Sequence, residues 1–168
     1  PAGEAGFYAA LATLGKVIFF AVSPIASVMF PLVSQYQSNG RKYKSIFKLS
    51  FVLVLLIAFF ISIFYLFFPK LAVLILFGKN YLPIIPYLKL FIPIFLLFAF
   101  SFLLINYFLS IKKTKAIIFY ILAAIIQAGA IFFVHQNLVQ IAVISLLAMS
   151  FLFISLLIYY FLNEKETD

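Results

Sequence analysis

The stretch from Ser45 to Phe68 reads SIFKLSFVLVLLIAFFISIFYLFF, and Lys48 is its only charged residue. About 20 consecutive apolar residues are needed to cross the roughly 30 Å hydrocarbon layer of a bilayer, so this stretch is long enough to span one. Its apolar residues run continuously and do not alternate with polar ones, which argues against a strand of a transmembrane barrel. It therefore predicts a transmembrane helix, which satisfies its own backbone hydrogen bonds in lipid.

Four further apolar runs lie around this stretch, at residues 6–36, 86–110, 114–134 and 138–162. The chain of 168 residues is 67% hydrophobic, with a mean hydropathy of +1.26. A water-soluble domain of this size could not cover so much apolar surface. We therefore expect an all-α polytopic membrane protein with five transmembrane helices.

The positive charges predict how these spans are oriented. The net charge is +8, but the cations lie in short connections between apolar runs, which indicates membrane topology and no nucleic-acid partner. The connections after the first and third spans hold seven cations: Arg41, Lys42, Lys44, Lys48, Lys112, Lys113 and Lys115. The connection after the second span holds Lys70, Lys79 and Lys89. The positive-inside rule then places the connections after the first and third spans, and the tail at 163–168, in the cytoplasm. The chain start would lie outside. We expect the protein in the inner or plasma membrane of the cell.

The connection after the second span contains a short apolar segment. It begins at Pro69 and reads PKLAVLILFGKNY, with an apolar core too short to cross the bilayer. Proline suits a first helical turn and glycine a helix end. We expect a helix at about residues 70–77, lying at the outer surface and ended by Gly78. Prolines then bend the start of the third span, where Pro93 is a candidate hinge.

Catalytic chemistry is sparse in this sequence. There is no Asp or Glu between Ala5 and Asn163, there is no Cys, and the single histidine, His135, falls in a predicted outer turn. A hydrolase needs a nucleophile with a base, paired carboxylates or a metal. The Gly-Lys-Asn at 78–80 lacks the remainder of a phosphate-binding loop. We therefore expect no enzyme activity, no metal and no cofactor, with His135 as a solvated turn residue.

The first span carries a stripe of small and polar residues. At 100° per residue, Thr13, Lys16, Ser23, Ser27 and Ser34 fall within an arc of about 80° on one side of a helix. Pro24 and Pro31 lie beside the stripe and predict bends, so both are candidate hinges.

Three interpretations of the stripe are open. Small residues let helices pack closely, and serine hydroxyls can bond to backbone carbonyls. The stripe could instead line a wet cavity into which Lys16 points, because an intramembrane lysine needs water or an anionic partner. Lys16 could also extend to the outer interface. In the fourth span, Gln127 is either a cavity residue or a donor in an interhelical hydrogen bond, and Asn106 in the third span is interpreted in the same way.

Several segments together resemble a known family. Residues 4–20 read EAGFYAALATLGKVIFF and residues 27–50 read SVMFPLVSQYQSNGRKYKSIFKLS. These segments and the later IKKTK at 111–115 resemble the seventh helix onward of polysaccharide or oligosaccharide flippases, in the multidrug/oligosaccharidyl-lipid/polysaccharide exporter superfamily. The shared motifs are Gly6-Phe7-Tyr8, then Phe30, Pro31 and Ser34, and then Phe77, Gly78 and Tyr81.

The resemblance implies two six-helix lobes that face a central cavity. The chain then corresponds to most of the C-terminal lobe of a longer protein, and its partners would be the missing N-terminal lobe, membrane lipids and a lipid-linked oligosaccharide of the polyprenyl diphosphate type. Such proteins move this substrate from the inner to the outer leaflet by alternating access. The candidate cavity residues are Lys16, Thr13, Ser23, Ser27 and Gln127, with Lys16 the candidate partner of the diphosphate.

Other functions stay open from the sequence. A flippase for a lipid-linked peptidoglycan precursor and a multidrug exporter belong to the same superfamily, although a cavity lysine suits an exporter of cations poorly. A membrane glycosyltransferase or ligase is an alternative of another class, but Arg41 and His135 are predicted on opposite sides of the membrane. A structural membrane subunit without a ligand is the last alternative.

Overall fold

The computed structural model describes residues 2–134 and 136–164, and every regular element among them is a helix. In chain order these are α1 (Ala2–Ser38), α2 (Lys44–Phe67), α3 (Pro69–Phe77), η1 (Lys79–Ile84), α4 (Ile85–Ser110), η2 (Thr114–Ala116), α5 (Ile117–Phe133) and α6 (Leu138–Glu164). His135 and residues 165–168 of the expected tail lie outside the described residues.

Within the described part of the chain, five helical runs are long and apolar enough to cross a membrane: Gly6–Ser38, Lys44–Phe67, Lys79–Ser110, Thr114–Phe133 and Leu138–Asn163. The predicted all-α, multi-pass membrane fold is therefore confirmed. The expected limits differ most for the third span, which was expected to begin at residue 86. The helical run begins seven residues earlier because η1 leads directly into α4.

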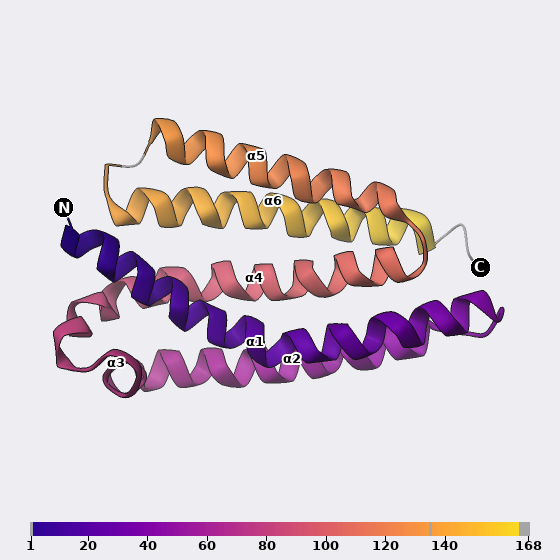
Figure 1. The fold of residues 1–168 in the computed structure, drawn as a ribbon, viewed down its shortest axis with the longest axis horizontal. Helices are drawn as coiled ribbons and strands as arrows, with labels where there is room; N and C mark the ends of the chain where they lie inside the picture. The colour runs from indigo at the N-terminus through magenta and orange to yellow at the C-terminus, as the bar shows by residue number, and fades with distance from the viewer. Residues whose placement is uncertain (1, 135, 165–168) are drawn as a thin grey trace.

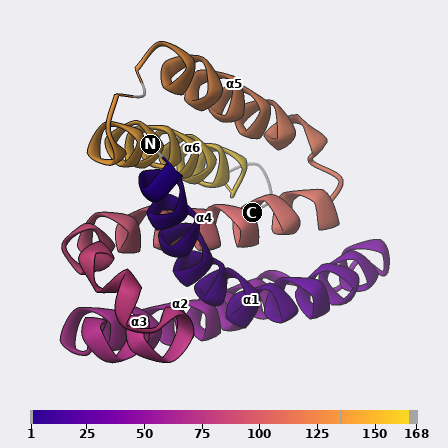
Figure 2. The same cartoon turned by 60° about the vertical axis from the view of Figure 1, so that its left-hand side comes forward.

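Helix α4 is the centre of the bundle. It packs against α1, α2 and α6, whereas α5 packs mainly on α6 (Figures 1 and 2). The α1–α2 and α4–α5 connections lie at one end, and α3, the chain start and the α5–α6 connection lie at the other (Figure 1). We call these the basic end and the α3 end. The two cation-rich connections thus share one end, as the charge pattern requires, while its assignment to the cytoplasm stays a prediction.

Helix α1 is bent, and its two limbs differ in their contacts with α4 (Figures 1 and 2). The first limb lies on α4, where Tyr8 makes an edge contact with Phe91 and the side of Gly15 meets the ring of Phe95. The second limb lies along α2, with Met29 and other residues lining a groove between the two helices. Because proline removes a helical hydrogen bond and crowds the preceding turn, the prolines inside α1 account for the bend.

The connection between α2 and α4 forms as expected. Pro69 lies in the first turn of α3, and Gly78 ends the helix with a φ of 78°. Only glycine adopts this left-handed region without steric cost, so the chain turns sharply here into η1. Lys112, in the α4–α5 connection, has a φ of 61° although it carries a side chain.

Candidate functional site

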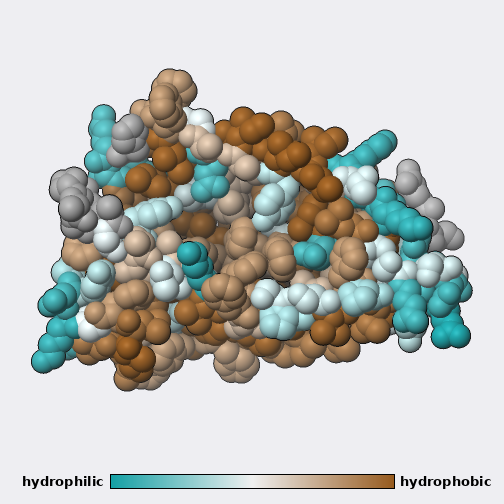
Figure 3. Space-filling model, viewed as in Figure 1, coloured by the Kyte–Doolittle hydropathy of each residue, from teal (hydrophilic) through white to brown (hydrophobic). Residues whose placement is uncertain are grey.

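The polar stripe of α1, defined as Thr13, Lys16, Ser23, Ser27 and Ser34, lies on the side of the helix that the bundle does not cover. Thr13, Lys16 and Ser27 are exposed, and the two other serines are half-buried. The opposite side of α1 is fully buried through Leu11, Leu14, Ile18, Val22, Ala26 and Met29. In Figure 3, pale and teal surface follows α1, with brown surface on either side of much of it.

The hydroxyl groups of the stripe are bonded within α1. Thr13 Oγ1 donates to the carbonyl oxygen of Ala9 at 2.8 Å, and Ser27 Oγ donates to that of Ser23 at 3.0 Å. These bonds satisfy the hydroxyls without a neighbouring helix. Since none of the described helices packs on this side, the packing interpretation would require a helix outside the described chain.

Lys16 lies in the half of the bundle nearer to the α3 end. The preceding residue, Gly15, abuts Phe95, which is ten residues or about 15 Å along α4 from its first residue. The hydroxyl of Tyr65, near the α3 end of α2, donates to the carbonyl oxygen of Leu14 at 2.9 Å. These two contacts hold the α1 backbone beside Lys16 in place.

The electrostatic surroundings of Lys16 are unusual for a membrane helix. Between Ala5 and Asn163 the chain contains no carboxylate side chain, so no acid in that range can pair with its ammonium group. An exposed ammonium facing hydrocarbon is costly, and such groups normally face water, protein or an ionic ligand. The stripe is therefore a part of the membrane-spanning surface that is suited to meet a hydrated or anionic ligand.

The candidate hinges are inside long helices. Pro24 and Pro31 lie within α1, and Pro93 lies within α4. The bend of α1 is plain in two views (Figures 1 and 2). Along the chain, Pro24 comes after Gly15 and Phe19, which contact α4, and is the first α1 residue that lines the groove with α2 near the basic end. This arrangement places Pro24 where a change of bend would move one limb relative to the other.

The two amide side chains differ from each other. Gln127 Nε2 donates to Ser145 Oγ on α6 at 3.0 Å. Of the two roles expected for Gln127, a cavity residue or an interhelical hydrogen bond, the structure shows the hydrogen bond. For Asn106 the structure shows a hydrogen bond of a different kind. Its Nδ2 donates to the carbonyl oxygen of Phe102 at 2.8 Å, four residues back on the same helix, because an asparagine amide can reach the free lone pair of that carbonyl.

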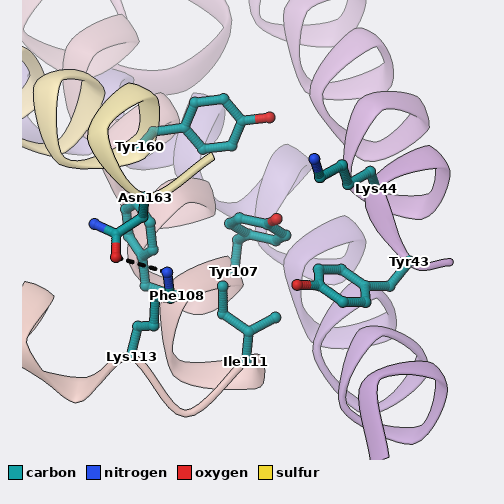
Figure 4. Close-up of a pocket in the computed structure, with 8 residues that line it drawn as sticks. All are labelled: Tyr43, Lys44, Tyr107, Phe108, Ile111, Lys113, Tyr160 and Asn163. Atoms are coloured by element: carbon teal, nitrogen blue, oxygen red, sulfur yellow. Dashed lines mark hydrogen bonds between the residues drawn. The ribbon is translucent and has the colours of Figure 1, made fainter. Parts of the chain in front are cut away.

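A cluster at the basic end was not foreseen from the sequence (Figure 4). Lys113 Nζ donates to Asn163 Oδ1 at 2.6 Å, which ties the α4–α5 connection to α6. The ring centres of Phe47 and Tyr107 lie 4.1 Å apart and join α2 to α4. Eight residues enclose a hollow of about 20 Å³: Tyr43, Lys44, Tyr107, Phe108, Ile111, Lys113, Tyr160 and Asn163.

This basic-end cluster fastens the bundle and does not offer room for a large ligand. A hollow of this size accepts about one water molecule. The rings of Phe108 and Tyr159, 4.9 Å apart, add a further α4–α6 contact there. The only hint in the sequence is that aromatic residues recur near the ends of three spans, which is also common where helices meet the membrane interface.

Comparison with known proteins gives one match. The model of a family described as polysaccharide biosynthesis protein matches residues 2–86, just over half of the chain. The matched region includes α1 with its polar stripe, α2, α3 and η1. No curated protein and no solved structure matches the chain.

Proposed function

Because this chain belongs to the polysaccharide biosynthesis protein family, we propose that it is part of a carrier that moves a lipid-linked saccharide from the inner to the outer leaflet. A role in polysaccharide synthesis or transport follows from the family, and five apolar helices make the protein multi-pass. The observation that carries the finer proposal is the uncovered polar stripe of α1, which a bundle packed only against lipid would not present.

In this proposal the stripe lines one wall of the substrate path, and the other wall comes from a further lobe of the same protein. Lys16 pairs with the diphosphate that joins the saccharide to its polyprenyl chain. A lysine ammonium is a compact point charge with three donors, and it suits phosphate oxygens that change position during transfer. The absence of carboxylates from Gly6 to Leu162 keeps the wall free of charges that would repel a diphosphate.

Alternating access needs an element that bends, and α1 is suited to this. Its first limb contacts α4 through Gly15–Phe95 and Tyr8–Phe91 and α2 through the Tyr65–Leu14 hydrogen bond, while its second limb lies along α2. Pro24 lacks the backbone N–H that would stiffen the region between the limbs. The basic-end cluster holds α2, α4 and α6 together, so we assign the larger movement to the α3 end.

The same proposal gives the orientation. The basic end faces the cytoplasm, where Lys and Arg near span ends are favoured and meet anionic headgroups. The α3 end faces outward, so Lys16 lies in the outer half of the membrane. In this position it would hold the diphosphate late in the transfer.

The test uses the full-length protein in cells that depend on it. Replacing Lys16 by Ala should cause lipid-linked saccharide to accumulate in the inner leaflet, measured with a membrane-impermeant sugar probe and by the loss of surface polysaccharide. Lys16→Arg should retain more export because it keeps the positive charge. Lys79→Ala, which removes an exposed cation at the α3 end, is the matched control.

Two results would contradict the proposal. Unchanged export with Lys16→Ala at normal protein level would remove this lysine from the substrate path. Accumulation in the outer leaflet after depletion of the protein would instead indicate a ligase or polymerase step. In that case the chain would serve an enzyme and not a carrier.

A further inference from the structure

Two apolar grooves lie along the contact between α1 and α2. The groove nearer to the α3 end has a volume of about 410 Å³ and is lined by α1, α2 and α3, including Val17, Phe64 and Ile75. The groove nearer to the basic end has a volume of about 360 Å³ and is lined by α1 and α2, including Val28 and Leu49. We call them the α3-side groove and the basic-side groove.

The two grooves lie at different depths in the membrane. Their α1 residues Val17 and Val28 are eleven positions apart, which is about 16 Å along a helix. This is about half of the roughly 30 Å thickness of the hydrocarbon layer. Each half of the membrane therefore has one groove on the same side of the α1–α2 pair.

The shape and lining of the grooves suit a hydrocarbon chain. Both volumes fall within the roughly 300–1,000 Å³ range of small-ligand sites. The linings are almost entirely apolar side chains, and Ile75, Val28 and Leu49 are 72%, 61% and 62% exposed. A helix is about 10–12 Å across with its side chains, so it would lie over these grooves and not within them.

Each groove is lined by an α1 residue that follows a member of the polar stripe in the sequence. Val17 follows Lys16, and Val28 follows Ser27, so a wall of the groove and a polar side chain come from successive residues. An amphipathic ligand with an anionic head at Lys16 would have the α3-side groove within reach of its apolar tail. Phe20, which is 66% exposed, lies between these two pairs along the helix.

We propose that the two grooves hold the polyprenyl tail of the lipid-linked saccharide while its head moves along the stripe. The basic-side groove receives the tail when the head is in the inner half of the membrane, and the α3-side groove receives it when the head has reached Lys16. The tail thus stays in apolar surroundings beside α1 throughout the transfer. This inference rests on the proposed function, because it takes its ligand from there.

The test is photo-crosslinking in vesicles that contain the full-length protein. The probe is a polyprenyl diphosphate disaccharide with a photoreactive group on the third isoprene unit, compared with a phospholipid that carries the same group on an acyl chain. Mass spectrometry should place the polyprenyl adducts on Val17, Val28, Leu49 and Ile75. An excess of unlabelled polyprenyl diphosphate disaccharide should abolish these adducts, and an excess of phospholipid should not.

Filling one groove provides the matched comparison. Val28→Trp should lower the adduct yield in the basic-side groove about tenfold, the factor that corresponds to 1.4 kcal/mol of lost contact. Val52→Trp makes the same change at an exposed valine of α2 that lines neither groove, and its yield should equal that of the wild type.

The outcomes separate this proposal from the proposed function. Equal labelling of the grooves by the phospholipid would identify ordinary boundary lipid, and adducts that join α1 to another segment of the same protein would identify a helix as the occupant. Either result overturns the tail sites even if Lys16→Ala blocks export. Normal export with Lys16→Ala, together with competed adducts in the grooves, would overturn the role of Lys16 and support the tail sites.

Discussion

Gly15 lets α1 lie against the Phe95 ring of α4, and replacing it by alanine should loosen that contact. A methyl group built at this position would lie 1.9 Å from carbon atoms of the Phe95 ring, far inside contact distance. The ring is half-buried and would have to turn away to make room for the methyl group. Overpacking of this kind costs about 1–3 kcal/mol.

The measurement is the thermal stability of the full-length protein in detergent, followed by size-exclusion chromatography after heating. For a folded unit of about 150–250 residues that unfolds cooperatively, 1 kcal/mol corresponds to a shift of about 2–4 °C. Gly15→Ala should therefore lower the midpoint by several degrees. It should also reduce export, because Lys16 is the next residue and would move with the displaced helix.

Two further variants test whether the effect of Gly15→Ala comes from its contact with Phe95. Phe95→Ala removes the obstructing ring, so Gly15→Ala should cost little in that background. The difference between the two backgrounds should fall in the range of about 0.5–3 kcal/mol seen for residues in contact. Gly129→Ala is the control, because a methyl group there meets nothing within 4 Å. Equal effects of Gly15→Ala with and without Phe95 would refute the close approach.

Three other changes test different parts of the structure. Tyr65→Phe removes the hydrogen bond to the Leu14 carbonyl, which should cost about 0.5–1.5 kcal/mol in the same heating assay, and no loss would mean that the bond does not form in the membrane. Pro24→Ala should slow export without changing the amount of inserted protein on a blot, and export at the wild-type rate would make the bend incidental. In this cysteine-free chain, Ser27→Cys should react with a water-soluble maleimide. Leu55→Cys, on an exposed apolar face of α2, should not react. Equal labelling of the two cysteines would argue against a wet stripe.

The sequence was most informative where physical constraints are local. The length of an apolar run decides whether it can cross the bilayer, so Ser45–Phe68 was sufficient to predict α2 within a residue at each end. Pro69 and Gly78 were sufficient for α3, because one residue suits a first turn and the other adopts a positive φ. The uncovered side of α1 agrees with the periodicity of its polar residues.

The sequence was less informative where the outcome depends on a partner helix. Gly15 looks like any small residue until Phe95 is known to lie against it. Asn106 and Gln127 have the same type of side chain, yet one bonds within its helix and the other across to α6. The basic-end cluster brings together residues as far apart as Tyr43 and Asn163, which no local pattern reveals.

The internal hydrogen bonds of Thr13 and Ser27 determine whether these two hydroxyls can act as donors or as acceptors toward a ligand. A hydroxyl has one proton and two lone pairs, and in both residues the proton is committed to a carbonyl of α1. These two hydroxyls therefore present acceptors to a passing ligand, and the hydroxyls of a saccharide are donors that can use them. Neither of the two has to break its own bond when a sugar arrives or to find a new one when it leaves. Lys16 is the only charged residue of the stripe, so its ammonium is the strongest point of attraction for an anionic group.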